Sequence, residues 1–478
     1  MSRIIEIVMY ILLSFPRIVR VCILSNSRIH FSLSLFFKRK YNNKYVPMKY
    51  ILFLSMLLLF PCYGCDKEPI PPPITPVKPS TTNTNLEIVW HVPFYSDSFP
   101  DFFWDPVFSN DYVIFTNTYD MKQGHERGVG VYHKATGKRH PAWQRDPGGI
   151  IDDVELLRNC QIGGVNENTM YLSTANSLYA YDIHTGNRLW RYKHSPYYGS
   201  LLVSVFGKDV LHNYGPGALS ESWYKIAKFD NASGNKTNIV QLFIENNYKF
   251  LIEIPAWTTN KENDTLLLFL TSGWNFDRVD GKVNAYCYNM TKQEMVWEKK
   301  GFTYDRDATK YAPLVIENNK VIFQSMRAVH CMDIASGELV WQHEYIPSSI
   351  CETSLLYYDN KLFSRTDGGK IYCYDAQSGQ VLWSNTSIEA FPAPDGRMDA
   401  YKDKLYLTAY PNDAYVYLYC LSISTGELLW KDKGPAEVIQ GGVIIDQKTG
   451  YLYCHSDWSV MCIDLNHRCD KKNIFHSL

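Results

Sequence analysis

The strongest constraint on the fold is a short pattern that recurs along the chain. The clearest copy runs from Ala180 to Trp190 and reads A-x-D-x-x-T-G-x-x-x-W. Three more copies keep the same spacing, with Cys in place of Ala, and begin at Cys331, Cys373 and Cys420. A pattern repeated in register predicts one structural unit per copy, because such units bury a core only by stacking on their neighbours.

Weaker copies fill the intervals between these four. Their turn positions, together with those of the clear copies, fall at residues 137, 186, 234, 293, 337, 379, 426 and 468. In one copy Lys292-Gln293 replaces the usual turn, in another the Trp is displaced to Trp143, and the copy around Gly234 has no Trp. The sequence therefore contains eight units with a period of about 42–59 residues, which is in the range for propeller blades.

Each unit is predicted to be strand throughout, with turns between the strands. In one unit the strand segments are Lys320–Phe323, Ala328–Asp333 and Glu338–Trp341, and no segment is long enough for an extended helix. The Asp and the Ser or Thr of the pattern suit a tight turn, since short polar side chains bond nearby backbone N–H groups and Gly tolerates a positive φ. The Trp is expected to fill the seam between neighbouring units.

This pattern resembles that of the quinoprotein-like (PQQ-repeat) family, and the resemblance covers residues 86–468. It implies an all-β fold, an eight-bladed β-propeller of four-stranded antiparallel blades. The eighth unit lacks its outer strand, but Leu86–Trp90 resembles Gly337–Trp341 without its Gly. We therefore expect this N-terminal strand to close the ring, which removes the open edge between the first and last blades.

The N-terminal region has the order of a bacterial lipoprotein signal. Residues 1–64 are interpreted as an upstream extension and a signal peptide, in which Met48-Lys49-Tyr50 precedes the apolar run Ile51–Phe60 and Gly64-Cys65 resembles a lipobox. The apolar run is too short to span a bilayer, which takes roughly twenty residues. Lipidation is expected at Cys65, followed by a Pro-rich tether over 65–85, and residues 469–478 form a C-terminal tail. These features predict a lipid-anchored protein of the bacterial cell envelope, with the outer membrane favoured.

Charge is distributed unevenly along the chain. Residues 1–64 hold nine Lys or Arg and a single acidic residue, so the remaining residues carry about nine net negative charges. Nucleic-acid binding requires clustered Lys and Arg that contact phosphates, so this composition argues against a nucleic-acid partner.

The cysteines are interpreted as structural. Five of them occupy the alanine position of the pattern, one per unit, and are expected to be small buried residues: Cys287, Cys331, Cys373, Cys420 and Cys462. Equivalent positions in different blades lie too far apart for a disulfide, and no zinc or haem spacing occurs. A disulfide among Cys160, Cys351, Cys454 and Cys469 stays open.

The family resemblance also implies one enzymatic alternative, a PQQ-dependent dehydrogenase with a calcium ion and a catalytic Asp in its central funnel. The chain departs from that pattern, because it has no adjacent Cys-Cys pair and no Cys-x-x-Cys-His, and hydrolase motifs are absent too. Asp277 and Asp280-Gly281 are more typical of a hairpin turn than of calcium ligands. We therefore predict no catalytic residue, no metal and no cofactor, and keep the dehydrogenase as the alternative.

Binding residues are predicted on one face of the propeller. The family resemblance implies that the strands run outward, so that the connections between second and third strands share a face. Four of these connections are enlarged, near 116–129, 213–224, 271–282 and 409–415. We take Trp223, Trp274 and Tyr410 as candidate anchors, because aromatic side chains on converging loops are typical of recognition surfaces. The alternative is that each ring packs on its own blade. The overall plan is similar to that of the lipid-anchored propellers of outer-membrane β-barrel assembly, which implies a scaffold for a protein partner. Glycan binding is a third hypothesis.

Overall fold

The computed structural model divides the chain into two compact units, Met1–Pro72 and Pro73–Leu478, and the residues it describes all belong to the second unit. The described residues are 86–93, 106–116, 129–143, 161–173, 177–193, 197–207, 209–216, 223–243, 249–252, 255–274, 282–304, 314–316, 319–325, 327–345, 355–366, 369–386, 388, 390–392, 397–411, 417–432, 439–456 and 459–467.

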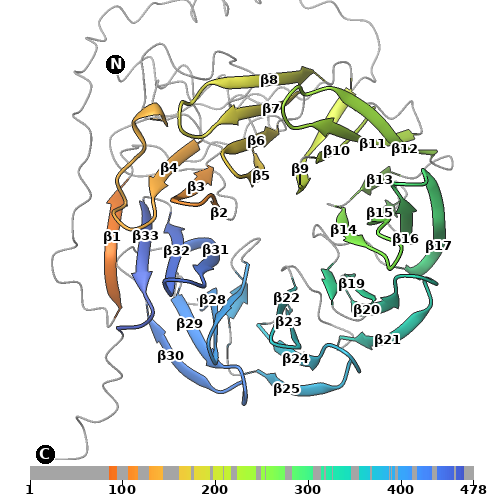
Figure 1. The fold of residues 1–478 in the computed structure, drawn as a ribbon. Helices are drawn as coiled ribbons and strands as arrows, with labels where there is room; N and C mark the ends of the chain where they lie inside the picture. Colours follow the sequence, from red (N-terminus) through yellow and green to blue (C-terminus); the bar gives the residue numbers. More distant parts are fainter. Residues whose placement is uncertain are drawn as a thin grey trace, which may run out of the picture. The chain divides into compact units, whose positions relative to one another are not determined.

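The strands form eight separate antiparallel sheets arranged in a ring, as Figure 1 shows, so the predicted eight-bladed β-propeller is confirmed. Blades are counted here in chain order, and strands from the centre outward. The first four are β2 (Val107–Phe108), β3 (Tyr112–Thr116) and β4 (Val129–His133); β5 (Gln161–Asn166), β6 (Thr169–Ser173), β7 (Ser177–Asp182) and β8 (Arg188–Lys193); β9 (Tyr197–Phe206), β10 (Asp209–Pro216), β11 (Trp223–Asp230) and β12 (Lys236–Phe243); and β13 (Lys249–Ile252) with β14 (Ala256–Thr259), β15 (Thr265–Trp274), β16 (Lys282–Asn289) and β17 (Glu294–Tyr304).

The second half of the ring repeats this arrangement. Its four blades are β18 (Leu314–Ile316), β19 (Lys320–Gln324), β20 (Ala328–Asp333) and β21 (Leu339–Glu344); β22 (Leu356–Tyr358), β23 (Lys361–Arg365), β24 (Ile371–Asp375) and β25 (Val381–Asn385); β26 (Ala390–Pro392) with β27 (Asp399–Tyr401), β28 (Lys404–Pro411), β29 (Tyr417–Ser422) and β30 (Leu428–Asp432); and β31 (Ile439–Asp446), β32 (Tyr451–Ser456), β33 (Ser459–Asp464) and β1 (Glu87–Pro93). In the fourth and seventh blades two short strands share the innermost position, and the first blade has three described strands.

The N-terminal strand closes the ring as predicted. β1 pairs antiparallel with β33, from Glu87 opposite Asp464 to Pro93 opposite Ser459. It also reproduces an irregularity of the other outer strands, a β-bulge at the residue before the Trp. Val89 is the extra residue in β1, and its counterparts in the second and fourth to seventh blades are Leu189, Val296, Val340, Leu382 and Leu429. A bulge bends the strand and interrupts the ladder, so it limits pairing at this outer edge.

The core lies in the seams, by which we mean the interfaces between adjacent blades. At most seams the outer-strand Trp of one blade lies against the turn of the next. The indole N–H donates to a backbone carbonyl there, as from Trp190 to Asn231 O (2.7 Å) and from Trp297 to Ile334 O (2.7 Å). Trp143 does the same toward Ile183 O (2.6 Å), although it lies in a short 3-10 helix, Pro141–Trp143, rather than at the regular position. The displaced Trp therefore reaches the same seam.

The Gly of the repeated turn is required by this contact. The Gly residues at the turn positions have positive φ, for example 68° at Gly337 and 72° at Gly379. A Cβ at Gly337 would lie 2.7 Å from the ring of Trp297, and a Cβ at Gly379 would overlap the ring of Trp341. Gly is thus needed both for the left-handed backbone and for the close approach of the indole.

The closing seam carries a polar contact centred on Lys134. The Lys134 carbonyl accepts hydrogen bonds from the Trp90 indole (2.7 Å) and the Tyr453 hydroxyl (3.2 Å). Its ammonium group lies 3.2 Å from Asp446 Oδ2 and 4.4 Å from the centre of the Phe108 ring. One residue of the first blade therefore contacts three strands of the last blade, because Trp90, Tyr453 and Asp446 lie in β1, β32 and β31.

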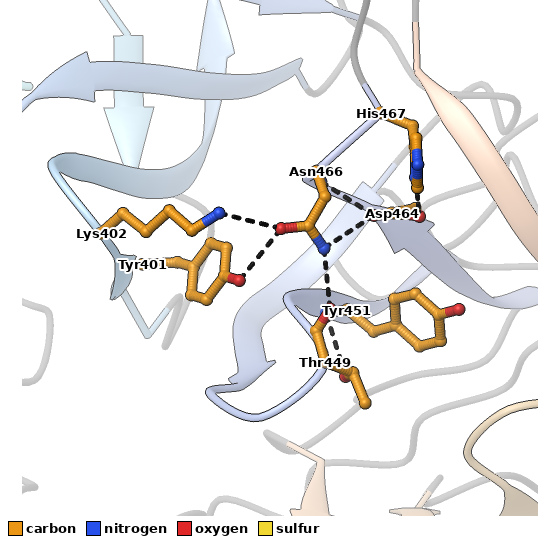
Figure 2. A network of polar contacts seen from close by, with 7 residues as sticks. All are labelled: Tyr401, Lys402, Thr449, Tyr451, Asp464, Asn466 and His467. Atoms are coloured by element: carbon orange, nitrogen blue, oxygen red, sulfur yellow. Dashed lines mark hydrogen bonds and ion pairs between the residues drawn. The ribbon is translucent and has the colours of Figure 1, made fainter.

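The last described residues are fixed by Asn466, as Figure 2 shows. Its Nδ2 donates to Thr449 O (2.8 Å), and its Oδ1 accepts from the Tyr401 hydroxyl (3.0 Å) and from Lys402 Nζ (3.1 Å). Tyr401 and Lys402 belong to the seventh blade and Thr449 to the eighth, so this single amide joins the two blades at the end of the last strand.

The predicted structural role of the repeated cysteines is confirmed. Cys287, Cys331, Cys373, Cys420 and Cys462 are buried thiols, as is Cys454 in β32. Burial raises the pKa of the Cys331 thiol to about 12, so this group stays protonated and packs as a small apolar residue. The other cysteines considered for a disulfide, Cys160, Cys351 and Cys469, lie outside the described residues.

The turn position offers a matched pair of substitutions. Gly379→Ala should lower the unfolding free energy by about 2–4 kcal/mol, because the new methyl group has an unfavourable φ and overlaps Trp341. Gln293 has a φ of 60° at the same position of the fourth blade, so Gln293→Ala should change stability by no more than about 0.5 kcal/mol. Thermal unfolding followed by circular dichroism measures both variants. Equal losses would show that the indole contact is not what selects Gly.

Candidate functional site

The candidate binding face carries the connections between second and third strands. The four enlarged connections run over 117–128, 217–222, 275–281 and 412–416, which lie outside the described residues, as do Asp277, Asp280 and Gly281. The strands extend further toward this face than the sequence suggested. Trp223 is the first residue of β11 and Trp274 the last of β15, while Tyr410 lies in β28.

The backbone pairing shows in which blade each of the three candidate anchors lies and which residue it pairs with. Trp223 pairs with Phe243 in the third blade, Trp274 with Lys249 in the fourth, and Tyr410 with Phe391 in the seventh. The structure therefore brings Trp223 and Trp274 to neighbouring blades and leaves Tyr410 across the ring, at β28 in Figure 1. The positions of the three side chains lie outside what the structure describes.

A layer of buried polar side chains lies directly beneath this face. It occupies one equivalent position near the end of the second strand, on the side that faces the next blade. Its described members are less than five percent exposed: Ser173, Gln324, Arg365, Thr408 and His455. Sequence reasoning missed this layer. In the sequence, a member of this layer lies two residues after an apolar residue of the same strand, and that apolar residue pairs with the alanine position of the pattern. Ser173, for example, lies two residues after Tyr171, which pairs with Ala180.

Arg365 is the largest side chain in this layer and is fully buried. Its Nη1 donates to Thr408 O (2.6 Å), so the guanidinium of the sixth blade bonds the backbone of the seventh. Burying a charged group is costly unless hydrogen bonds offset the lost hydration. This hydrogen bond thus ties the sixth blade to the seventh just below the connections that they carry.

Two blades show how short the connection between the second and third strands can be. In the fifth blade Ala328 N donates to Ser325 Oγ (3.1 Å), and in the sixth Thr366 N donates to Lys370 O (2.9 Å). His330 packs beside the first of these, with its Nε2 3.3 Å from Ser325 Oγ, and is 1% exposed. Burial lowers the pKa of His330 to about 4. The fold itself therefore needs at most five residues between these strands. The connections over 117–128, 217–222 and 275–281 are longer than that, whereas the one over 412–416 is not.

Two of the buried carboxylates that the structure describes are held by partners within the blades. Asp399 accepts hydrogen bonds from Ala400 N (2.8 Å) and Ile445 N (2.7 Å), and Asp264 is paired with Lys292 Nζ at 2.8 Å. Among the described residues, no group of three or more His, Cys, Asp or Glu side chains is placed to hold a metal ion. In the same residues, no helix has the length and apolarity that a bilayer crossing takes.

Comparison with known proteins relates part of the chain to one family. Residues 325–456 match the PQQ-repeat family model described as outer membrane protein assembly factor BamB. The chain is 27% identical over 179 residues to the outer membrane protein assembly factor BamB of Legionella pneumophila, which is 35% of this chain and 41% of that protein. It is 25% identical over 190 residues to the protein of the same name from Shewanella oneidensis, which is 37% of this chain and 44% of that protein. The chain thus spans less than half the length of these relatives.

Solved structures support the fold alone. The BamB structure from Moraxella catarrhalis superimposes with a TM-score of 0.52 at 14% identity, covering 79% of this chain and 99% of that one. A europium-containing methanol dehydrogenase superimposes with a TM-score of 0.55 at 11% identity, covering 78% of this chain and 84% of that one. Propellers of different function share this architecture, so function has to be argued from the site.

His330 makes stability depend on pH. Its pKa is near 4 when folded and near its ordinary value of 6.5 when unfolded, so the unfolded chain takes up the additional proton. Above pH 6.5 His330 is neutral in both the folded and the unfolded chain, so it adds no pH dependence. As the pH falls from 6.5 to 4, the unfolding free energy decreases by up to about 3 kcal/mol. Urea unfolding at pH 7 and pH 4.5 should therefore show a smaller pH effect in His330→Gln than in the wild type. The same pH effect in both proteins would contradict this assignment.

Proposed function

We propose that this BamB-like PQQ-repeat propeller is a non-catalytic scaffold of the bacterial cell envelope that presents its loop-bearing face to a protein partner. The observation that carries the proposal is the contrast among the connections on this face. The fifth and sixth blades close the same connection with a few residues held by Ser325 and Thr366. The third and fourth blades have longer connections, and in the seventh blade β28 extends further before a connection as long as that of the sixth. An aromatic residue lies at or near the adjoining strand end in each of these three blades, at Trp223, Trp274 and Tyr410.

Residues in excess of what a fold requires are a reason to expect recognition, since binding residues concentrate on loops held by a rigid scaffold. Here a buried hydrogen bond from Arg365 to the Thr408 carbonyl ties the sixth and seventh blades together beneath the loops. Aromatic side chains are also the anchors that most often dominate the affinity of protein interfaces. A protein partner therefore suits the face better than a small reactive substrate.

The leader and the relatives support the proposed cellular location. The run Ile51–Phe60 with Gly64-Cys65 resembles a signal for lipidation at Cys65, and the composition of the Pro-rich stretch up to residue 85 suits a tether. The partial match to proteins named outer membrane protein assembly factor supports a role in the assembly of outer-membrane proteins. Cross-linking the native envelope, solubilising it in detergent and identifying what the propeller captures tests this directly. Capture of barrel-assembly proteins supports the scaffold. Capture of a glycan, or PQQ-dependent dye reduction above the no-cofactor control, replaces it with one of the alternatives.

The anchors can be tested apart from folding. Replacing Trp223, Trp274 and Tyr410 together by Ala should weaken capture of the identified partner by at least about thirtyfold, since interface hot spots cost about 2 kcal/mol or more when truncated. The matched control replaces three exposed apolar residues of outer strands, Leu189, Val340 and Leu382, by Ser and should leave capture unchanged. Melting temperatures of both proteins are measured alongside. Wild-type affinity in the triple Ala variant would place the binding site elsewhere.

The anchor to the membrane rests on one atom, the sulfur of Cys65. Cys65→Ala removes the acylation site, so the protein should move from the membrane fraction to the soluble fraction after cell lysis. Palmitate labelling of the wild type and not of the variant provides the chemical control. A variant that stays in the membrane fraction although the signal peptide has been cleaved would contradict a lipid anchor.

A further inference from the structure

The indole at the seam between the first and second blades is held differently from the one at the next seam. Trp143 lies in the 3-10 helix Pro141–Trp143, outside the strands, and is 5% exposed. Its indole N–H donates to Ile183 O of the second blade (2.6 Å), and its ring packs on that of Tyr181, with ring centres 5.8 Å apart. At the next seam Trp190 is instead part of strand β8. The position of Trp143 therefore depends on the short helix that carries it.

His140 is the residue that begins this helix. Its backbone N–H donates to Val131 O in β4 (2.8 Å), and its carbonyl accepts from Trp143 N (3.0 Å). Its side chain accepts from the Ala142 N–H at Nδ1 (3.2 Å), and Pro141, at the first helical position, has no N–H to satisfy. His140 is therefore the N-cap of the helix, and its side-chain bond requires an Nδ1 that carries no proton.

The surroundings of His140 favour this neutral form. Its ring contacts that of Tyr112, with ring centres 5.0 Å apart and planes 75° apart, and His133 contacts the same tyrosine at 6.1 Å. From the second blade His184 lies 6.4 Å away between ring centres. Burial and then the positive charge of His184 lower the pKa of His140 from its ordinary value of 6.5, whereas the carboxylate of Asp182 acts in the opposite direction.

We propose that His140 is a pH-sensitive cap, which holds Trp143 in the seam between the first and second blades and releases it on acidification. A proton on Nδ1 turns the acceptor into a donor, so two N–H groups would face each other where the bond from Ala142 was. When His184 is protonated as well, two like charges lie on opposite sides of the seam. Loss of the cap frees the helix, and with it the bond from the indole to Ile183 O.

The direction of the pH effect follows from the lowered pKa of His140. The released state has the higher pKa and therefore binds the additional proton. The cap is intact above pH 6.5 and is lost as the pH falls through the lowered pKa. This device is a property of the fold and does not depend on the proposed function.

Fluorine NMR of the full-length protein labelled with 5-fluorotryptophan tests the cap locally. The Trp143→Phe variant identifies the resonance of Trp143 among the 12 tryptophans. In the wild type this resonance should shift between pH 7 and pH 4.5. Over the same range the protection of the amides of 142–143, relative to their intrinsic exchange rate at each pH, should fall at least about fivefold. A resonance and a protection that stay constant would overturn the proposal.

Substitutions on both sides of the seam identify the titrating group. His140→Asn keeps an oxygen that accepts from the Ala142 N–H but does not titrate, so its Trp143 resonance should stay at the neutral-pH position throughout. His140→Ala lacks the acceptor and should show the lower protection already at pH 7. His184→Gln removes the like charge and should move the midpoint to higher pH, whereas His330→Gln, in the fifth blade, should leave it unchanged. An Asn variant that titrates as the wild type does overturns the proposal, whether or not the Ala variant folds.

Discussion

The structure depends on one contact made between successive blades: an indole from an outer strand lying on a glycine in the next blade's turn. A single four-stranded sheet of this kind exposes two apolar faces and has no stability of its own, so each blade is stable only between two others. The indole buries a large apolar surface and its N–H satisfies a carbonyl at the turn, as from Trp383 to Ile423 O (2.8 Å). Because both partners belong to the repeated pattern, the same contact fixes the order and spacing of the blades.

Most of the fold could be predicted because the residues that make this contact recur in a pattern that is local in sequence. The Asp, Gly and Trp of one copy lie within a few residues of one another, and equal spacing predicts equal blades. What could not be predicted depends on residues that the sequence separates widely. The ion pair between Lys134 and Asp446 joins the first blade to the last, and the bonds of Asn466 join the seventh to the eighth. Nothing in the repeat marks either pair, since each occurs once.

The site was predicted less completely than the fold, for a physical reason. The expected loops near 213–224 and 271–282 are partly strand, because paired strands can extend beyond the repeated pattern wherever both chains continue far enough, as β15 and β16 do. The buried layer that includes Arg365 and His455 was missed because polar residues in a strand normally indicate an exposed face. Here they face the neighbouring blade, and only alignment of the eight copies on their paired residues makes the position visible.

Ring closure by β1 has a consequence for how the chain is made. The strand that completes the last blade is synthesised before the other strands of the propeller, whereas its partner β33 is synthesised last. The propeller therefore cannot be completed one blade at a time, and the first strand waits through most of translation before its hydrogen bonds and Trp90 are covered. Any prematurely terminated chain keeps an uncovered strand edge and an exposed indole, which are the features that chaperones and proteases recognise in misfolded proteins. Quality control can thus distinguish full-length chains from incomplete ones by a single strand.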